Sequence, residues 1–210
     1  MKTISVFTPK FRKKEILSQI EECLDKGWTG LGYKTVEIEE AWKKYANFRH
    51  AHFLNSNTVG LHLAVRILKI ANQWKDNDEI ITTPLTFVSS NHALLYENLK
   101  PVFADVDDQL CLDPEDVESK ITKKTKAILF VGIGGNIAQY KAIKELCIKY
   151  NLKLIFDAAH CAGTKIPKIL HGVVSVDSQV GWDADVTIFS FQAVKNLPTA
   201  DSGMICFRNQ

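Results

Sequence analysis

The chain has 210 residues, of which 46% are hydrophobic, and its 26 basic and 24 acidic side chains leave a formal net charge of +2. This length and composition suffice for a compact domain with its own core, and they exclude a disordered tail or a fibre. The near balance of charges gives no basic field that would favour nucleic acid or an anionic membrane surface as a partner.

The sequence shows no targeting segment and no disulfide framework. Residues 1–8 lack the apolar run of a secretion signal, and no stretch approaches the roughly 20 apolar residues that span a bilayer. The five cysteines are scattered without C-x-x-C spacing, and an odd number fits reduced thiols. We therefore expect a soluble, cytoplasmic protein without a structural zinc site.

Helical periodicity alternates with short apolar runs along the chain. In chain order, we predict helices at 35–47 and 57–74, a strand at 79–83, a helix at 88–97, a strand at 101–106, a helix at 113–121, a strand at 127–133, a helix at 139–150, and strands at 153–156, 186–191 and 204–207. Each apolar run ends abruptly in polar or glycine residues, as buried parallel strands do. We expect an α/β fold in which helices flank a mostly parallel mixed sheet.

One of these helices carries its own start signal. Asp113 is a typical N-cap residue, and Pro114 follows it at the first helical position, where proline is favoured. Glu115 and Asp116 place acids in the first turn, where they complement the helix dipole. These residues predict a helix that begins directly after Asp113.

Chemically active residues lie at the ends of the predicted strands, where open α/β sheets bind their ligands. Asp157 and His160 follow one strand, Ser190 and Lys195 lie at the end of the next, and Phe87 follows an earlier one. Because parallel strands end at the same edge of a sheet, we expect these side chains to lie close together.

This set of residues matches the needs of pyridoxal phosphate. A lysine must form a Schiff base with its aldehyde, and partial desolvation of Lys195 would help by lowering the pKa of the amine. A carboxylate, here Asp157, must pair with the pyridine nitrogen so that the ring accepts electrons from a developing carbanion. Phe87 offers an aromatic face that stacks on the ring.

The phosphate group needs hydroxyls and free backbone N–H groups at a helix N-terminus, and Asn57, Thr58 and Ser190 are placed to provide them. Simpler interpretations exist for several candidates. Thr58 is alternatively only the N-cap of the helix that follows it, and Asp157 is alternatively a helix cap. Ser190 and His160 are alternatively hydrogen-bonding residues without a ligand, and Phe87 is alternatively a core side chain.

Ordered motifs give a specific resemblance. The segment Phe189-Ser190-Phe191-Gln192-Ala193-Val194-Lys195-Asn196 resembles the Schiff-base segment of the DegT/DnrJ/StrS family of pyridoxal-phosphate enzymes, which mostly aminate keto sugars attached to nucleotides. Four further stretches match that family in the same order: Gly27-Trp28-Thr29-Gly30-Leu31-Gly32, Ser56-Asn57-Thr58, Thr83-Pro84-Leu85-Thr86-Phe87 and Asp157-Ala158-Ala159-His160. The match covers nearly the whole chain, so it is far more specific than a lone lysine after a strand.

The resemblance implies a role for each matching residue in the reaction. Lys195 would be the Schiff-base lysine and proton shuttle, and Asp157 the partner of the pyridinium nitrogen. His160 would lie near the ring hydroxyl, and Phe87 would occupy the stacking position.

Other matching residues would hold the phosphate. Thr58 and Ser190 take the phosphate-contact positions of the family, with Asn57 and the backbone of Val59 beside them. Gln192 departs from the pattern, because the family usually has histidine three residues before the lysine. This departure bears on substrate preference more than on cofactor binding.

The resemblance further implies the domain plan and the assembly. Residues 51–210 would form the pyridoxal-phosphate-binding major domain of a type I enzyme, and residues 1–50 an arm and helices that frame the site and a homodimer interface. The family continues into a small C-terminal domain, which is absent from this chain ending at Gln210. The implied reaction is amino transfer from a donor such as glutamate to a keto sugar on a nucleoside diphosphate.

Three alternatives remain at this point. A dehydratase of the same family is one, although that branch replaces the Schiff-base lysine with histidine, so Lys195 favours transamination. A non-catalytic fragment that binds cofactor or a partner chain is another. The third is a dinucleotide-dependent dehydrogenase, suggested by the glycine-rich segment 132–136, although the fingerprint G-x-G-x-x-G would need glycine where Ile137 stands. No histidine and cysteine set reaches four ligands at familiar spacing, so we expect no metal site.

Overall fold

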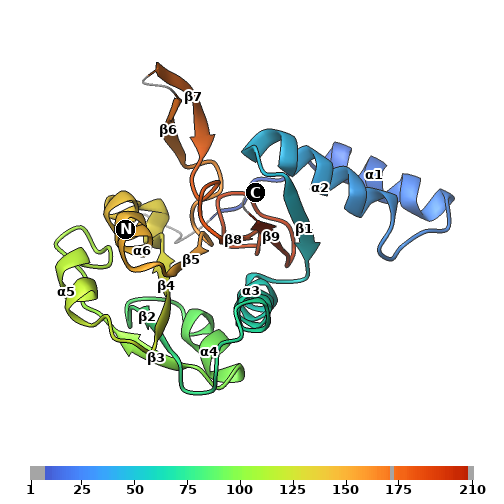
Figure 1. The fold of residues 1–210 in the computed structure, drawn as a ribbon. Coiled ribbons are helices and arrows are strands. Elements are labelled where there is room, and N and C mark those ends of the chain that lie inside the picture. Colours follow the sequence, from blue (N-terminus) through green and yellow to red (C-terminus); the bar gives the residue numbers. More distant parts are fainter. Residues whose placement is uncertain (1–7, 171–172, 208–210) are drawn as a thin grey trace, which may run out of the picture.

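The computed structural model describes residues 8–170 and 173–207 of the chain. Its helices are α1 (Lys13–Asp25), α2 (Tyr33–Ala46), α3 (Asn57–Ala71), α4 (Ser89–Tyr96), α5 (Pro114–Ser119) and α6 (Tyr140–Tyr150). Its strands are β1 (His50–Leu54), β2 (Glu79–Thr82), β3 (Lys100–Phe103), β4 (Thr125–Val131), β5 (Lys153–Asp157), β6 (Lys165–Leu170), β7 (Val173–Gln179), β8 (Val186–Ser190) and β9 (Gly203–Phe207). Figure 1 shows their arrangement.

A seven-stranded sheet forms the centre of the molecule, with the strand order β1-β9-β8-β5-β4-β2-β3. The strands from β8 to β3 in this order run parallel to their neighbours. β9 runs antiparallel to both β1 and β8. β6 and β7 form a separate two-stranded antiparallel sheet. The predicted α/β fold with a mostly parallel mixed sheet is therefore confirmed.

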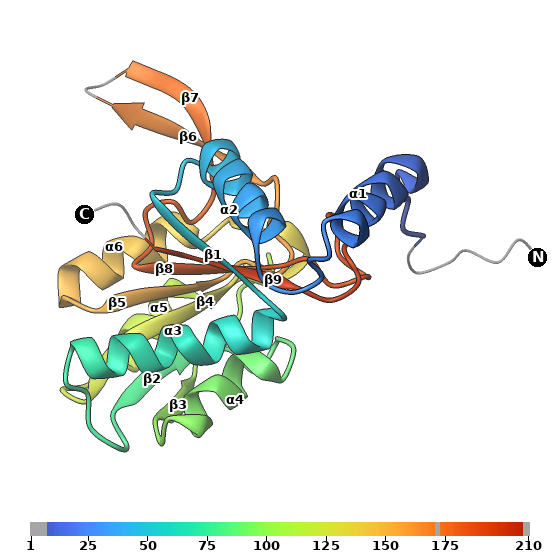
Figure 2. The ribbon, with the colours of Figure 1, turned by 90° about the vertical axis from the view of Figure 1, so that its right-hand side faces the viewer.

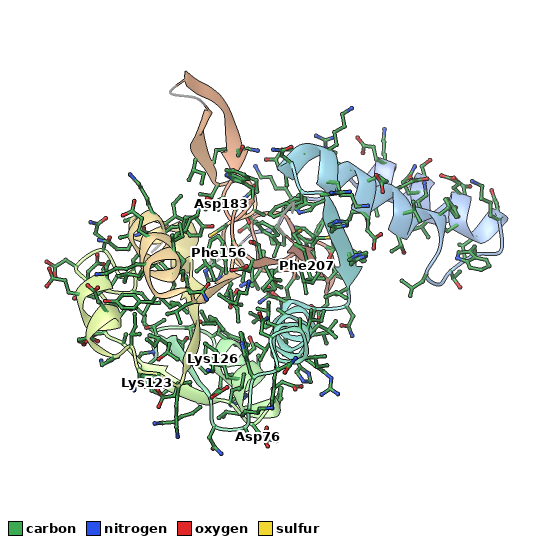
Figure 3. All side chains as sticks on the ribbon, in the orientation of Figure 1. Asp76, Lys123, Lys126, Phe156, Asp183 and Phe207 are labelled. Atoms are coloured by element: carbon green, nitrogen blue, oxygen red, sulfur yellow. The ribbon has the colours of Figure 1, made fainter. Side chains whose placement is uncertain are left out.

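Each face of this sheet is covered by its own helices. Ile128 and Phe130 of β4 face a core shared with α2, α5 and α6, whereas Leu129 faces a core shared with α3 and α4. Figure 2 shows α3 and α4 on one side of the sheet and α2 and α6 on the other. Phe156 of β5 is fully buried near the middle of the molecule (Figure 3). Burial on both faces explains why the central strands appear as continuous apolar runs in the sequence.

Most predicted elements are present, and some end earlier than predicted. The strand predicted at 101–106 ends at Phe103, and the one predicted at 127–133 ends at Val131. The second ends early because a 3-10 turn begins at Ile133.

The start of α5 follows its predicted signal. The Asp113 carboxylate accepts a hydrogen bond from the backbone N–H of Glu115 at 2.9 Å, and Pro114 is the first helical residue.

Neither β1 nor the pair β6 and β7 was predicted. β1 is a short edge strand with a mixed burial pattern, so it gave no continuous apolar run.

α1 lies away from the central sheet (Figure 1), and none of its residues is buried. Its apolar side chains Ile16, Ile20 and Leu24 are between 41% and 62% exposed. They line an apolar groove of about 920 Å³ between α1 and α2. Among the described residues, no helix combines the length and the apolar character needed to cross a membrane.

Candidate functional site

A cavity of about 360 Å³ opens at the carboxyl ends of β4, β5 and β8. The N-terminus of α3 and the loop after β8 complete its wall. All the site residues predicted from the sequence line it, namely Asn57, Thr58, Phe87, Asp157, His160, Ser190 and Lys195. The topology therefore brings together residues that are 138 positions apart in the sequence, since Asn57 and Lys195 both line this cavity.

Asp157 is the buried acid of this cavity, with only 3% of its surface exposed. Its Oδ2 accepts a hydrogen bond from the Ser90 hydroxyl at 2.7 Å. Its Oδ1 accepts from the Asn57 amide at 3.3 Å and from the Ala159 backbone N–H at 3.1 Å. Burial raises the pKa of this carboxyl above its ordinary value, and the three hydrogen bonds act in the opposite direction. The helix-cap interpretation of Asp157 is wrong, because a turn rather than a helix follows β5.

The loop after β8 holds Lys195 at the cavity wall. Its backbone N–H donates to the Gln192 carbonyl at 2.9 Å, and the Gln192 side-chain oxygen accepts from the Val194 N–H at 3.1 Å. Farther along, the Thr199 hydroxyl donates to the Phe191 carbonyl at 2.8 Å. These local bonds close the loop on itself, so the half-buried Lys195 side chain extends from a fixed backbone.

The amine of Lys195 and the ring of His160 share an environment that disfavours positive charge. Burial lowers the pKa of Lys195, and the carboxylate of Asp157 acts in the opposite direction. Burial also lowers the pKa of His160, and the charge of Lys195 lowers it further. This lowering has the direction that partial desolvation of the Lys195 amine produces. A larger share of the lysine is therefore the neutral, nucleophilic amine.

The N-terminus of α3 supplies polar groups to the opposite wall. Ser56, not Thr58, is the N-cap, because its hydroxyl accepts from the Val59 N–H at 3.3 Å. The interpretation of Thr58 as a simple cap is therefore wrong. The side-chain oxygen of Asn57 is buried and has no hydrogen-bond partner among the described residues. Gly203 lets β9 approach this helix closely, since a Cβ there would lie 2.7 Å from the Asn57 nitrogen.

Phe87 lies at the wall of the cavity and is 75% exposed. The interpretation of this residue as a core side chain is therefore wrong. Its neighbour Thr86 forms a hydroxyl–hydroxyl hydrogen bond with Ser90 at 2.8 Å, which holds the segment before α4. An exposed aromatic face at a cavity suits stacking with a planar ligand.

Ser90 is the residue of this site that sequence analysis missed. It is completely buried in the first turn of α4, and its hydroxyl joins Thr86 to Asp157. Nothing in the local pattern signals a contact with a residue 67 positions away. The sequence could at most have shown that a polar residue lies on the inner face of a short helix, without naming its partner.

The glycine-rich segment 132–136 does not offer its N–H groups to a phosphate. The Gly132 N–H donates to the Asp157 carbonyl at 3.1 Å, and the Gly134 N–H donates to Nδ1 of His160 at 3.0 Å. A dinucleotide site needs such groups to point at the ligand, so the dehydrogenase alternative loses its main support. Within residues 8–170 and 173–207, no group of three or more His, Cys, Asp or Glu side chains is arranged to hold a metal ion.

The sheet and the lysine–carboxylate pair at its carboxyl edge define the major domain of a type I pyridoxal-phosphate transferase fold. A sequence model of the DegT/DnrJ/EryC1/StrS aminotransferase family matches residues 10–210. The chain belongs to this family, and the resemblance seen in the ordered motifs is confirmed.

Two curated proteins are similar to the chain over most of its length. The uncharacterized protein MJ1066 of Methanocaldococcus jannaschii is 35% identical over 208 residues, which represent 97% of this chain and 50% of the relative. The spore coat polysaccharide biosynthesis protein SpsC of Bacillus subtilis is 34% identical over 193 residues, or 91% of this chain and 46% of SpsC. The chain therefore spans about half the length of these curated relatives.

Solved structures confirm the fold. The putative sugar aminotransferase Spr1654 of Streptococcus pneumoniae, in its PLP-form, has a TM-score of 0.87 and 27% identity, covering 100% of this chain and 54% of that one. PseC of Helicobacter pylori, an aminotransferase of pseudoaminic acid biosynthesis, has a TM-score of 0.80 and 28% identity, covering 97% of this chain and 51% of that one.

Proposed function

We propose that this chain is the cofactor-binding part of a pyridoxal-phosphate-dependent aminotransferase. The observation that carries the proposal is that Lys195, with its lowered pKa, and the buried carboxylate of Asp157 line the same cavity. Membership of the aminotransferase family supports it. An ordinary surface lysine or an ordinary buried acid would not be expected to line the same cavity at the carboxyl edge of the sheet.

The residues at this cavity fit pyridoxal phosphate. Burial raises the pKa of the Asp157 carboxyl, and a protonated pyridine nitrogen beside it would favour the charged form. The buried side-chain oxygen of Asn57, which has no partner among the described residues, can accept a hydrogen bond. Phe87 would stack on the ring, and Thr58 and Ser190 would contact the phosphate.

Each of these side chains would have a defined task. Pyridoxal phosphate, when bound, supplies a ring that accepts electrons from a developing carbanion. Lys195 would hold the cofactor covalently and, when released from it, would carry a proton as a general base. Asp157 would keep the pyridine nitrogen protonated, and the N–H donors around this carboxylate favour its charged form.

For the substrates, we propose a keto sugar linked to a nucleotide and an amino-acid donor such as glutamate. One related structure is described as DesI in the presence of its TDP-sugar product, with 28% identity and a TM-score of 0.78. SpsC is named for polysaccharide biosynthesis. These names support the class of substrate, and Gln192 at the cavity wall would face the part of the substrate that differs between family members.

The proposal extends to the assembly and the compartment. We keep the division into an arm and helices over residues 1–50 and a cofactor-binding domain over residues 51–210, and we expect a homodimer. The exposed apolar side chains of α1 support an association surface within the first of these segments. All five cysteines are free, which fits a reducing, cytoplasmic compartment.

The test is a spectrum followed by covalent trapping. The purified chain is mixed with pyridoxal phosphate, reduced with borohydride and weighed by mass spectrometry, alongside Lys195→Ala and Lys141→Ala. Lys141 is the control because its side chain on α6 is 89% exposed. We expect a visible absorbance band and a covalent adduct at residue 195 in the wild type and in Lys141→Ala, and neither in Lys195→Ala. Absence of the adduct from all three proteins would overturn the proposal.

A further inference from the structure

The segment Gly132–Asn136 remains without a task in the proposed function, although it lies against the site. Two of its N–H groups and one of its carbonyls form hydrogen bonds with the last residue of β5 and with the turn that follows this strand. The Gly132 N–H donates to the Asp157 carbonyl at 3.1 Å, and the Cys161 thiol donates to the Gly132 carbonyl at 3.3 Å. These bonds hold the chain on both sides of His160.

The bond to His160 itself has a chemical consequence. The Gly134 N–H donates to Nδ1 of the ring at 3.0 Å, so Nδ1 must carry a lone pair and no proton. In a neutral imidazole the proton then lies on Nε2. His160 lines the cavity, so the ring nitrogen left for a ligand is a hydrogen-bond donor.

We propose that the turn at Gly132–Asn136 is a positioning device that locks His160 as the neutral Nε2–H tautomer, so that the ring always presents an N–H donor to the cavity. The part of this inference that concerns the cofactor rests on the proposed function. There the partner of Nε2–H is an acceptor oxygen, which the ring hydroxyl of pyridoxal phosphate provides once it has lost its proton.

The backbone at the turn explains why glycine stands at position 134. Gly134 has φ = 61°, in the left-handed region where most side chains are strained. This conformation aims its N–H at the histidine ring. A Cβ at this position would meet nothing within 4 Å, so the constraint is conformational rather than steric. Asparagine tolerates this region better than other residues, whereas β-branched residues do not.

The surroundings of the ring keep it neutral. The charged groups that act on His160 are Lys195, which disfavours a second positive charge, and Asp157, which favours it. Burial adds to the effect of Lys195, and the pKa of the histidine is lowered. Protonation would place a hydrogen on Nδ1 directly opposite the Gly134 N–H, so it would also break the bond that orients the ring.

The tautomer can be observed on the full chain without any cofactor. Nitrogen-15 NMR of histidine-labelled protein at neutral pH reports which ring nitrogen carries the proton, and the His160 signals are those that disappear in His160→Gln. We expect Nδ1 to appear unprotonated and Nε2 protonated. A charged ring or an Nδ1–H tautomer in the wild type would overturn the inference.

Variants of the turn separate the device from general folding. Gly134→Asn should retain the Nε2–H signature, because asparagine adopts the left-handed conformation. Gly134→Val should show a mixture of tautomers, since the turn opens while the rest of the sheet, checked by circular dichroism, persists. If Gly134→Val is folded and its tautomer is unchanged, the turn does not act as proposed. If the valine variant does not fold, the wild-type spectrum still decides the outcome.

Two isosteric variants of His160 then test the donor. Asparagine places its amide where Nδ1 lies, and glutamine places its amide where Nε2 lies. In the presence of pyridoxal phosphate, we expect His160→Gln to keep the wild-type position of the absorbance band and His160→Asn to shift it. If the tautomer is as expected in the free chain and no variant binds cofactor, the positioning role stands and the proposed function fails. If the asparagine variant keeps the wild-type band, the donor role is overturned.

Discussion

Asp157 is held where water does not solvate its charge, and this burial sets the sign of its contribution to stability. Because burial raises its pKa, the folded chain binds a proton there more tightly than the unfolded chain. The contribution to stability is therefore full below the ordinary carboxyl pKa and is lost as the pH rises through the folded-state pKa. Above the folded-state pKa, the buried carboxylate costs stability, and a cation bound beside it would offset that cost.

Asp157→Asn should therefore change stability and binding in opposite directions. Without cofactor, the wild type should lose stability as the pH rises through the folded-state pKa of Asp157, whereas the variant should not, because asparagine does not titrate. The free energy of unfolding of the variant should therefore increase relative to that of the wild type. Pyridoxal phosphate should bind about ten- to a hundred-fold more weakly, which is the range for one hydrogen bond to a charged group. Urea unfolding at several pH values and absorbance titration measure the two effects. A variant that loses stability at high pH would contradict the argument.

Ser90 is a positioning residue that acts through Asp157. Its hydroxyl donates to the carboxylate at 2.7 Å and favours the charged form. In Ser90→Ala, we expect cofactor affinity to fall about tenfold. Because the pKa of Asp157 rises further in this variant, the loss of cofactor affinity at low pH should begin at a higher pH than in the wild type. Absorbance titration across pH measures this. Ser119→Ala is the control, because it removes a hydroxyl from the exposed part of α5. An equal loss in both variants would refute the role of Ser90.

At the scale of single residues, the sequence predicts those with reactive side chains and misses those that position other residues through hydrogen bonds. Asp157 ends β5, and His160 and Lys195 lie in the loops after β5 and β8; all three have reactive side chains, so strand ends and ordered motifs were sufficient to find them. Ser90 and Gly134 contribute one hydroxyl and one backbone N–H, whose partners are fixed only by the tertiary fold. No local pattern encodes those partners.

The contact between β9 and α3 shows how an element can fix a binding wall. Gly203 begins β9, and a Cβ there would lie 2.7 Å from the backbone of Ser56 and of Asn57, at the start of the helix. Backbone atoms cannot rotate away as a side chain can. Either the strand or the N-terminus of α3 must move to accommodate a larger residue.

Gly203→Ala should accordingly destabilise the chain and weaken binding together. We expect a loss of about 1–3 kcal/mol in the free energy of unfolding, as for overpacked sites, and weaker binding of inorganic phosphate or of cofactor. Gly30→Ala is the matched control, because a Cβ there meets nothing within 4 Å. Urea unfolding and absorbance titration measure both effects. Similar stabilities for the two variants would show that the contact is not tight in solution.

At the scale of elements, the predictable part is the buried parallel sheet. β2, β4, β5 and β8 are almost entirely buried, so apolar residues fill the middle of each strand and their existence was predicted. β1 lies at the sheet edge and exposes some of its side chains, which breaks the apolar run. β6 and β7 form their own two-stranded sheet, so they lie outside the alternation that guided the prediction.

At the scale of the whole molecule, the packed sheet and its helices contrast with α1, which has no buried residue. Both faces of the sheet are covered by helices, whereas α1 contributes no buried residue and lies apart (Figures 1 and 2). An amphipathic helix gains little from an isolated position in water, because most helical stability comes from burying its apolar face. We therefore expect α1 to be covered when the protein is assembled.

A homodimer would cover this surface twice by symmetry, so a single substitution should act on both copies. We chose Ile20→Glu, because Ile20 is 49% exposed in the groove between α1 and α2. Burying such a side chain contributes about 1.5–3 kcal/mol, so losing it in both subunits should weaken association by roughly a hundred-fold or more. Ile148→Glu is the control, since Ile148 is 71% exposed on α6. Sedimentation equilibrium should show a dimer for wild type and Ile148→Glu and a monomer for Ile20→Glu at the same concentration. A monomeric wild type, or a dimeric Ile20→Glu, would mean that a second copy does not cover α1.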